Sequence, residues 1–394
     1  MTLRVFLSCG EASGDLYAGA LIREMRALVP DIDVFGLGGR EFGRAGGRAI
    51  ADVQEVTTTG LTEPVARLPQ LLAVKRRLLE AAFATPPAVF VPIDFWGFNY
   101  RLARAMKARG VPVAYYISPQ LWASRPWRMK SMRGIARRVL VIFPFEEAIY
   151  RKGGVPVEFV GHPLVDLAAG TKPRQEFLEI KGLSPSAPTV ALLPGSRPGE
   201  VTRILPGLVS AAALIAARVP SAQFVVARAP NLDDSLFEPL HASGLDRSAR
   251  VRSVEGDTDG VLAASDVALL ASGTATVQAA LHNTPMVIVY RVSPWTYRLG
   301  RRLVTIDTFG MVNLIAGQKI VPELIQDDFT PEAVAAEAIS MLTDGTRAAR
   351  IREGLREVRR KLGGGGASRR AAAAILEIAS TVQSDASTPR TTPM

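Results

Sequence analysis

Val190-Ala191-Leu192-Leu193-Pro194-Gly195-Ser196-Arg197-Pro198-Gly199-Glu200 lies at the middle of this 394-residue chain. Its apolar first half predicts a buried parallel strand, and the prolines and glycines after it predict a tight turn followed by a helix. Such a turn binds anions, because unpaired backbone N–H groups and the helix dipole point at one place. Arg197 adds a guanidinium group suited to phosphate. We therefore expect Gly195, Ser196 and Arg197 to hold a diphosphate, although an ordinary turn with a solvated arginine fits the same residues.

Composition limits the class of protein. The length allows two or three domains, and 48% hydrophobic with 21% charged residues is normal for a globular chain. The formal net charge of +10 favours anionic partners: nucleic acid, a phosphorylated substrate or an acidic membrane face. Cys9 is the single cysteine, which excludes an internal disulfide and fits a reducing cytosol. Because no stretch approaches the ~20 apolar residues of a membrane span and residues 1–9 do not form a signal peptide, we expect a soluble or peripheral protein.

Two series of alternating strands and helices predict an α/β fold with two parallel sheets and a cleft between them. Strands are expected at 4–8, 34–37, 88–93, 112–117, 139–143, 157–160, 189–193, 223–227, 266–270 and 286–290. Helices are expected near 16–28, 68–84, 99–109, 125–138, 145–151, 200–218, 234–243 and 275–281. We expect domains at 1–165 and 188–345, a linker at 166–187, helices at 346–383 that pack back on the first domain with Ser368 as a cap, and a disordered tail at 384–394.

The turn after the first strand is rich in glycine. Its sequence, Gly10-Glu11-Ala12-Ser13-Gly14-Asp15, is neither a dinucleotide fingerprint nor a P-loop. Ser13 or Asp15 acting as the cap of the following helix is the structural alternative to a binding role.

Asp94 ends an apolar strand and precedes the aromatic stretch Phe95–Phe98. Rings that exclude water raise the pKa of a carboxyl group and make it a better base, so Asp94 is a candidate general base. A helix cap is the alternative, although Asn99 is better placed for that role.

Further candidates follow other strands. Ser118-Pro119-Gln120 ends a strand in the first half, either as a binding loop or as a plain turn. Ser272-Gly273-Thr274 forms a second strand-to-helix turn that suits an anion, and Gln278 lies one turn inside the helix. The three histidines have no metal-ligand spacing, so we expect no metal site, and no G-x-S-x-G nucleophile turn occurs at a strand end.

The stretch 125–138 is basic and carries Trp127, Met129 and Met132 among its arginines. This composition is typical of a helix on an anionic interface, and single-stranded nucleic acid would also accept it. A solvated helix face is the third interpretation.

Taken together, these stretches resemble the lipid-A-disaccharide synthase family, in order from Arg4 to about Ser380. The matching pieces are Gly10–Asp15, Gly60 with Glu63, Ile93-Asp94 with Phe98-Asn99, Ile117–Gln120 with Trp122-Ala123, Phe143–Glu146, Val160–Pro163, Leu193–Arg197, Ser272–Ala275, Tyr290-Arg291, Asn313–Gly317 and Val321–Leu324. The resemblance implies a GT-B glycosyltransferase with two Rossmann-like domains that face a central cleft, and neither metal nor cofactor.

The resemblance also implies the reaction. UDP-2,3-diacylglucosamine would be the donor and 2,3-diacylglucosamine 1-phosphate (lipid X) the acceptor. The products would be UDP and a β-1,6-linked disaccharide 1-phosphate. The family works as a peripheral protein on the cytoplasmic face of the inner membrane, and the anionic surface of that membrane fits the basic charge of this chain. The oligomeric state stays open, with a homodimer as one option. Catalytic roles are implied for Asp94, Arg197 and Glu11. Substrate-binding roles are implied for Ser13, Gly14, Ser118, Gln120, Pro194, Gly195, Ser196, Ser272, Gly273, Thr274, Gln278, Arg291 and Asn313.

This chain departs from the family pattern at a few positions. Trp96-Gly97 replaces Pro-Asp, Ser124 replaces tryptophan, and Gln278 replaces an acidic residue that binds the ribose hydroxyls. Glutamine can still accept one hydrogen bond but lacks the charge. A related GT-B transferase or epimerase that uses another UDP-sugar, such as UDP-GlcNAc, is the alternative enzyme. A basic nucleic-acid-binding protein is the more distant alternative, although no nucleic-acid-binding signature is visible and we expect no nucleic-acid partner.

Overall fold

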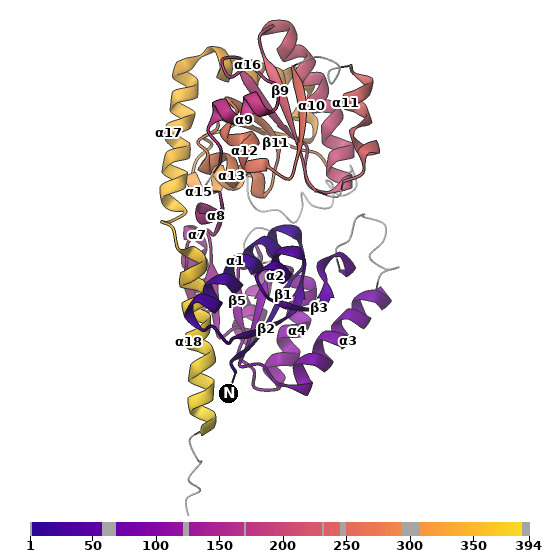
Figure 1. The fold of residues 1–394 in the computed structure, drawn as a ribbon. Helices are drawn as coiled ribbons and strands as arrows, with labels where there is room; N and C mark the ends of the chain where they lie inside the picture. The colour runs from indigo at the N-terminus through magenta and orange to yellow at the C-terminus, as the bar shows by residue number, and fades with distance from the viewer. Residues whose placement is uncertain are drawn as a thin grey trace, which may run out of the picture. The chain divides into compact units, whose positions relative to one another are not determined.

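The computed structural model describes residues 2–56, 68–120, 126–168, 171–230, 232–244, 250–292 and 308–387 (Figure 1). The chain divides into two compact units, Met1–Pro163 with Leu362–Met394, and Leu164–Lys361. Residues 166–187, which we expected to form a linker, thus belong to the second unit. The C-terminal helices are shared, because α17 (Gly345–Lys361) lies in the second unit and α18 (Ala367–Ser387) in the first.

The first unit is a seven-stranded parallel sheet in the order β3-β2-β1-β4-β5-β6-β7. Its strands are β1 (Arg4–Cys9), β2 (Asp33–Gly38), β3 (Arg48–Asp52), β4 (Val89–Ile93), β5 (Ala114–Tyr116), β6 (Arg138–Val141) and β7 (Val157–Phe159). Its helices include α1 (Ala12–Leu28), α2 (Arg40–Arg44), α3 (Leu68–Ala84), α4 (Trp96–Ala108), α6 (Met129–Ile135) and α7 (Pro144–Lys152), and α18 packs against α1. The strand order reverses between β1 and β4, and ligands of open α/β sheets bind outside the carboxyl ends of the strands at such a point.

The core of this unit explains why its apolar runs form strands. The ring of Phe6 in β1 stacks on that of Phe35 in β2 at a centroid distance of 5.4 Å and meets that of Phe90 in β4 at a tilt, 4.7 Å away. All three side chains are fully buried. Burial on both faces of a parallel sheet requires such nearly continuous apolar strands.

The second unit is a six-stranded parallel sheet in the order β10-β9-β8-β11-β12-β13. Its strands are β8 (Thr189–Leu193), β9 (Gln223–Arg228), β10 (Val251–Glu255), β11 (Val267–Ala271), β12 (Met286–Tyr290) and β13 (Glu323–Ile325). Its helices include α8 (Leu164–Leu167), α9 (Arg174–Ile180), α10 (Pro198–Arg218), α11 (Glu238–Ala242), α12 (Thr258–Ala263), α13 (Thr274–Leu281), α15 (Met311–Ala316), α16 (Pro331–Thr343) and α17. Here the order reverses between β8 and β11, so the two predicted anion turns follow the two strands at the switch point.

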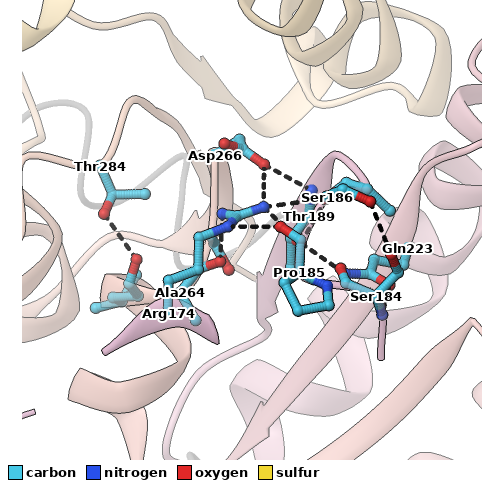
Figure 2. A network of polar contacts seen from close by, with 12 residues as sticks. Arg174, Ser184, Pro185, Ser186, Thr189, Gln223, Ala264, Asp266 and Thr284 are labelled. Atoms are coloured by element: carbon cyan, nitrogen blue, oxygen red, sulfur yellow. Dashed lines mark hydrogen bonds and ion pairs between the residues drawn. The ribbon is translucent and has the colours of Figure 1, made fainter. Parts of the chain in front are cut away.

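Arg174 of α9 binds residues at the amino-terminal ends of β8 and β11 in the second sheet, as Figure 2 shows. Its guanidinium donates to the carboxylate of Asp266 at 2.9 Å, to the Thr189 hydroxyl at 3.2 Å and to the carbonyl of Ala264 at 2.6 Å. Asp266 in turn accepts the N–H of Thr189 at 2.8 Å. The segment before β8 is therefore tied to the segment before β11, which is why it belongs to this unit.

Several elements differ from the expected ones. The expected helix at 125–138 is shorter, because a 3₁₀ turn at Pro126–Arg128 precedes α6 and Arg138 already belongs to β6. Ser368 lies buried inside α18 and is not its cap. That helix continues to Ser387, into the stretch expected to be disordered, and residues 388–394 lie outside the described part of the chain.

Among the described residues, α10 alone is long and apolar enough to cross a membrane by length and composition, a test that core helices of globular proteins also pass. Its buried side chains include Ile204, Leu208 and Ile215, and the helix packs against α16, α11 and β11. We therefore interpret α10 as a core helix of the second unit.

Candidate functional site

Asp94 follows β4 in a turn with unusual backbone geometry. Its φ is 45° and that of Phe95 is 50°, so two residues other than glycine adopt the left-handed conformation in succession. The N–H of Asp94 donates to the carbonyl of Ile117 at 3.0 Å, and its own carbonyl accepts the Tyr115 hydroxyl at 2.8 Å and the Asn99 amide at 2.9 Å. Strained residues persist only where their surroundings over-determine them, and they cluster at functional sites.

The side chain of Asp94 is exposed, so our expectation that neighbouring rings desolvate it is wrong. Trp96 instead stacks on Tyr100 at 4.7 Å and on Tyr115 at 6.3 Å. Phe95 lies over Gly10, where a Cβ atom would come within 2.2 Å of the ring. The aromatic stretch therefore packs around the turn, while the Asp94 side chain stays exposed to solvent.

Asn99, which we expected to be a helix cap, is a fully buried residue inside α4. It accepts the Ser8 hydroxyl at 2.6 Å and donates to the carbonyls of Ser8 and Ile93 at 3.1 Å and 3.2 Å, besides that of Asp94. The N-cap of α4 is Phe95, without a side-chain cap. Asn99 thus joins the ends of β1 and β4, a role that sequence reasoning missed because its partners lie far along the chain.

The turn after β1 carries Glu11 and Ser13, both half-buried. Glu11 is the N-cap of α1, in extended conformation and without a side-chain cap bond, and Ser13 lies inside the helix. Gly14 is buried, and a Cβ atom there would lie 3.2 Å from that of Cys9, so its role is to let α1 approach β1.

Asp15 does not cap its own helix as we considered. Its buried carboxylate accepts the N–H groups of Gly39, Glu41 and Phe42 at 2.7 Å, 2.8 Å and 3.1 Å. It therefore fixes the start of α2 and the turn after β2, next to the turn that carries Glu11.

Ser118 and Gln120, the two candidate binding residues after β5, differ in their exposure to solvent. Ser118 is buried, and its hydroxyl bonds to that of Tyr150 and donates to the carbonyl of Pro119 at 3.0 Å, so it holds the loop. Gln120 is exposed. Gly60, Glu63, Trp122, Ala123 and Ser124 lie outside the described residues.

In the second unit, the groups of the Pro194–Arg197 turn that we expected to donate to an anion contact a carboxylate of the protein itself. Glu200 accepts the N–H of Ser196 at 3.1 Å and the Arg197 guanidinium at 3.2 Å. Gly195 has a φ of +122°, and a Cβ atom there would lie 2.6 Å from that of Glu200, so only glycine fits. Arg197 is half exposed, at 51% of its side chain. Binding of a diphosphate at this turn stays a prediction, in which the phosphate would take the place of Glu200 or lie beside it.

The second predicted anion turn follows β11. The Ser272 hydroxyl donates to the carbonyl of Phe309 at 3.2 Å. Since a hydroxyl carries one hydrogen, Ser272 in this arrangement can accept a bond from a ligand but cannot donate one to a phosphate. Gly273, the N-cap of α13, and Thr274 are exposed, so this turn offers the backbone N–H groups of the first helical turn and the Thr274 hydroxyl as donors.

Gln278 of α13 takes part in a contact between helices. Its amide donates to one carboxylate oxygen of Asp259 in α12 at 3.0 Å, and His282 contacts the other oxygen at 2.8 Å. Sequence reasoning missed Asp259, because it lies on another helix, 19 residues before Gln278. His282 follows Gln278 by four residues, the spacing of one helix face, and this signal could have linked the two side chains.

Arg291 and Asn313 are held within the fold. The Arg291 guanidinium donates to the carbonyls of Gln326 and Phe329 and lies 4.6 Å from the Phe329 ring centroid. Asn313 is buried and donates to the Val321 carbonyl at 2.9 Å and to Glu323 at 2.7 Å. These bonds support the strand end and the start of α15, and a direct role in substrate binding stays a prediction.

Glu323 extends this support to the second anion turn. Its carboxylate accepts the N–H groups of Phe309 and Gly310 at 2.8 Å and 3.0 Å, and Phe309 is the residue that holds Ser272. Within the described ranges, no group of three or more His, Cys, Asp or Glu side chains gathers as metal ligands would.

Comparisons with known proteins agree with this geometry. A family model described as lipid-A-disaccharide synthetase matches residues 5–378. The chain is 44% identical to the lipid-A-disaccharide synthase of Koribacter versatilis, over 91% of this chain and 93% of that protein. It is 42% identical to the synthase of Myxococcus xanthus, over 95% and 97%.

Solved structures show the fold. A UDP-GlcNAc 2-epimerase from Neisseria meningitidis aligns with a TM-score of 0.65 at 12% identity, covering 96% of this chain and 100% of the other. A glycosyltransferase of kitacinnamycin aligns with a TM-score of 0.63 at 17% identity, covering 96% and 99%. Two parallel-sheet α/β domains of this kind constitute the GT-B fold.

Proposed function

Because this chain belongs to the lipid-A-disaccharide synthase family, we propose that the switch points of its two sheets carry the acceptor and donor chemistry of one glycosyl transfer. The chain is a glycosyltransferase of lipid A biosynthesis. The alternative of a UDP-GlcNAc epimerase is not favoured, since relatives more than 40% identical carry the synthase name and the epimerases share only the fold.

The proposed donor is UDP-2,3-diacylglucosamine and the proposed acceptor is lipid X. Both are anionic, which suits a chain with a net charge of +10. The product is the β-1,6-linked disaccharide 1-phosphate together with UDP. The 6-hydroxyl oxygen of the acceptor bonds to the anomeric carbon of the donor, and the bond from that carbon to the UDP oxygen breaks. UDP leaves with the electron pair, and the hydroxyl proton goes to a base.

Asp94 is the proposed base, and one observation carries this assignment. Its carboxylate is exposed at the carboxyl end of β4, beside the switch point, while its backbone is fixed by Ile117, Tyr115 and Asn99. A fixed backbone holds the carboxylate in position, which general-base catalysis requires more than an altered pKa. Glu11, on the adjacent turn after β1, is proposed to orient the acceptor together with Ser13.

Departure of UDP needs positive charge or N–H donors on the diphosphate. We assign this role to Arg197 with the Pro194–Ser196 turn, and to the backbone N–H groups that begin α13 at Gly273 and Thr274. The contact of the Glu200 carboxylate with Ser196 and Arg197 supports the choice, because the same donors would suit a phosphate oxygen.

The test combines the purified protein with both acylated glucosamine substrates and detects UDP. Release of UDP that requires both substrates is expected. Asp94→Asn, which keeps the shape and removes the base, should lower kcat roughly 10²–10⁴-fold with donor binding unchanged. Asp31→Asn is the matched control, an exposed aspartate just before β2, at the amino-terminal ends of the strands of the same sheet, and should keep full turnover. An Asp94→Asn enzyme that keeps its turnover but loses donor affinity would show that Asp94 binds and does not act as the base.

A further inference from the structure

A hydrogen-bonded bridge joins α12 to α13, and the proposed transfer reaction does not use it. Its members are Asp259, Gln278 and His282. The Asp259 carboxylate has one oxygen 3.0 Å from the Gln278 amide nitrogen and the other 2.8 Å from Nε2 of His282. His282 is nearly buried, with 9% of its side chain exposed, while 28% of the Asp259 side chain is exposed. The carboxylate is therefore held from two sides and still reaches solvent.

The position of this bridge relates it to the proposed diphosphate turn. Gln278 follows Thr274 by one helical turn, which is roughly 6 Å of rise along α13. In a nucleoside diphosphate, a single CH₂ group separates the ribose from the phosphate. A diphosphate on the N–H groups at the start of α13 would thus place its ribose within reach of Gln278 and Asp259. This step rests on the proposed function, which assigns a UDP-sugar to this unit.

The bonds of Gln278 fix what each group can do there. Its NH₂ group donates to Asp259, so its carbonyl oxygen is the part available to accept a hydroxyl. A neutral amide oxygen forms a weaker hydrogen bond than a carboxylate does. We propose that Asp259 supplies the charged acceptor for the ribose hydroxyls of the nucleotide, with Gln278 as its neutral companion and His282 as a positioning residue.

This arrangement makes an unusual prediction for the substitution Gln278→Glu. Considered alone, it would add a charge that strengthens ribose binding. Beside Asp259, however, it would bring two carboxylates together where an amide now donates, and like charges at this distance repel. We therefore expect Gln278→Glu to weaken UDP binding. The double variant Asp259→Asn/Gln278→Glu restores one amide and one carboxylate with their places exchanged, and should regain most of the affinity.

The experiment measures Kd by calorimetry for UDP, 2′-deoxy-UDP and 3′-deoxy-UDP. The wild type should bind UDP at least about tenfold more tightly than one of the deoxy forms, as expected for a hydrogen bond to a charged group. Asp259→Asn should bring that ratio close to one. His282→Ala should reduce it in part, and His282→Gln, which keeps an N–H donor, should restore it.

Asp266→Asn is the control. It also removes a carboxylate that joins two segments of this unit, but this one lies at the amino-terminal ends of the strands. It should lower the melting temperature and leave the UDP-to-deoxy-UDP ratio unchanged. An Asp259→Asn protein that keeps the wild-type ratio, or a double variant no better than Gln278→Glu, overturns the proposal. A wild type that binds no UDP contradicts the proposed function itself, which separates the two failures.

Discussion

Arg197 is the residue on which departure of the proposed leaving group depends most. It is the N-cap of α10, half exposed, and its guanidinium already contacts a carboxylate. Arg197→Ala should lose about 2–4 kcal/mol of transition-state stabilisation, seen as a fall in kcat/KM in the UDP-release assay. Arg218→Ala is the matched control, an exposed arginine at the far end of the same helix, and should stay close to the wild type. Turnover of Arg197→Ala near that of the control would remove Arg197 from the mechanism.

His162 is a residue whose burial makes the first unit sensitive to acid. It lies between Tyr17 and Phe143, and burial lowers the pKa of its imidazole from 6.5 to about 3. Between these values the unfolded chain binds a proton that the folded chain does not, so stability falls as the pH drops below about 6.5.

The free energy of unfolding in urea measures this effect. From pH 7 to about pH 4.5 the wild type should lose roughly 2–3 kcal/mol more than His162→Gln does. The exposed His241 provides the comparison, because His241→Gln should show the same acid loss as the wild type. Equal losses in wild type and His162→Gln would mean that His162 is protonated in the folded protein.

At the scale of elements, the long apolar runs could be predicted and the polar edge strands could not. β1, β4, β8 and β11 lie inside the sheets and are buried on both faces, so their sequences are continuous apolar runs. β3 (RAIAD) and β10 (VRSVE) lie at sheet edges, where exposed polar residues interrupt the run. They were missed for that reason.

The candidate site divides in the same way. The turns at Asp94, Arg197 and Ser272 follow apolar strands and could be located from sequence. The contacts that hold them could not, because they join distant residues: Asn99 reaches Ser8, and Asp259 reaches Gln278. Asp94 shows the limit most clearly, since the aromatic residues beside it suggested burial but pack against other partners.

The Asn99 bridge can be tested as the support of the Asp94 turn. Asn99→Ala removes an amide that three buried or half-buried carbonyls share, which should cost about 2–3 kcal/mol of unfolding free energy. Because the left-handed turn loses one of its fixing bonds, kcat should fall further than that of Gln54→Ala, an exposed amide in the same unit. Loss of stability without loss of kcat in the folded fraction would assign Asn99 to the fold alone.

At the scale of the whole chain, net charge and its placement bear on the proposed peripheral attachment to an anionic membrane. In α6, Met132 and Ile135 are buried, so these two side chains face the core and not the bilayer that the composition of the stretch suggested for Met132. Trp127, 62% exposed, is left with Lys130, Arg133 and Arg137 on the outside. In α17, two exposed arginines form ion pairs with acids, Arg356 with Glu353 and Arg360 with Glu357.

This difference makes α17 the natural control for a membrane-binding test. The protein should bind vesicles that contain anionic lipid at low salt, bind neutral vesicles less, and dissociate as salt screens the charge. Each basic residue near such a surface contributes about 1 kcal/mol, so Lys130→Gln/Arg133→Gln should weaken partitioning by roughly tenfold or more. Arg356→Gln/Arg360→Gln removes the same charge from residues that acids already neutralise, and should have a much smaller effect. Equal losses in the two double variants would mean that net charge alone, and no particular face, draws the protein to the membrane.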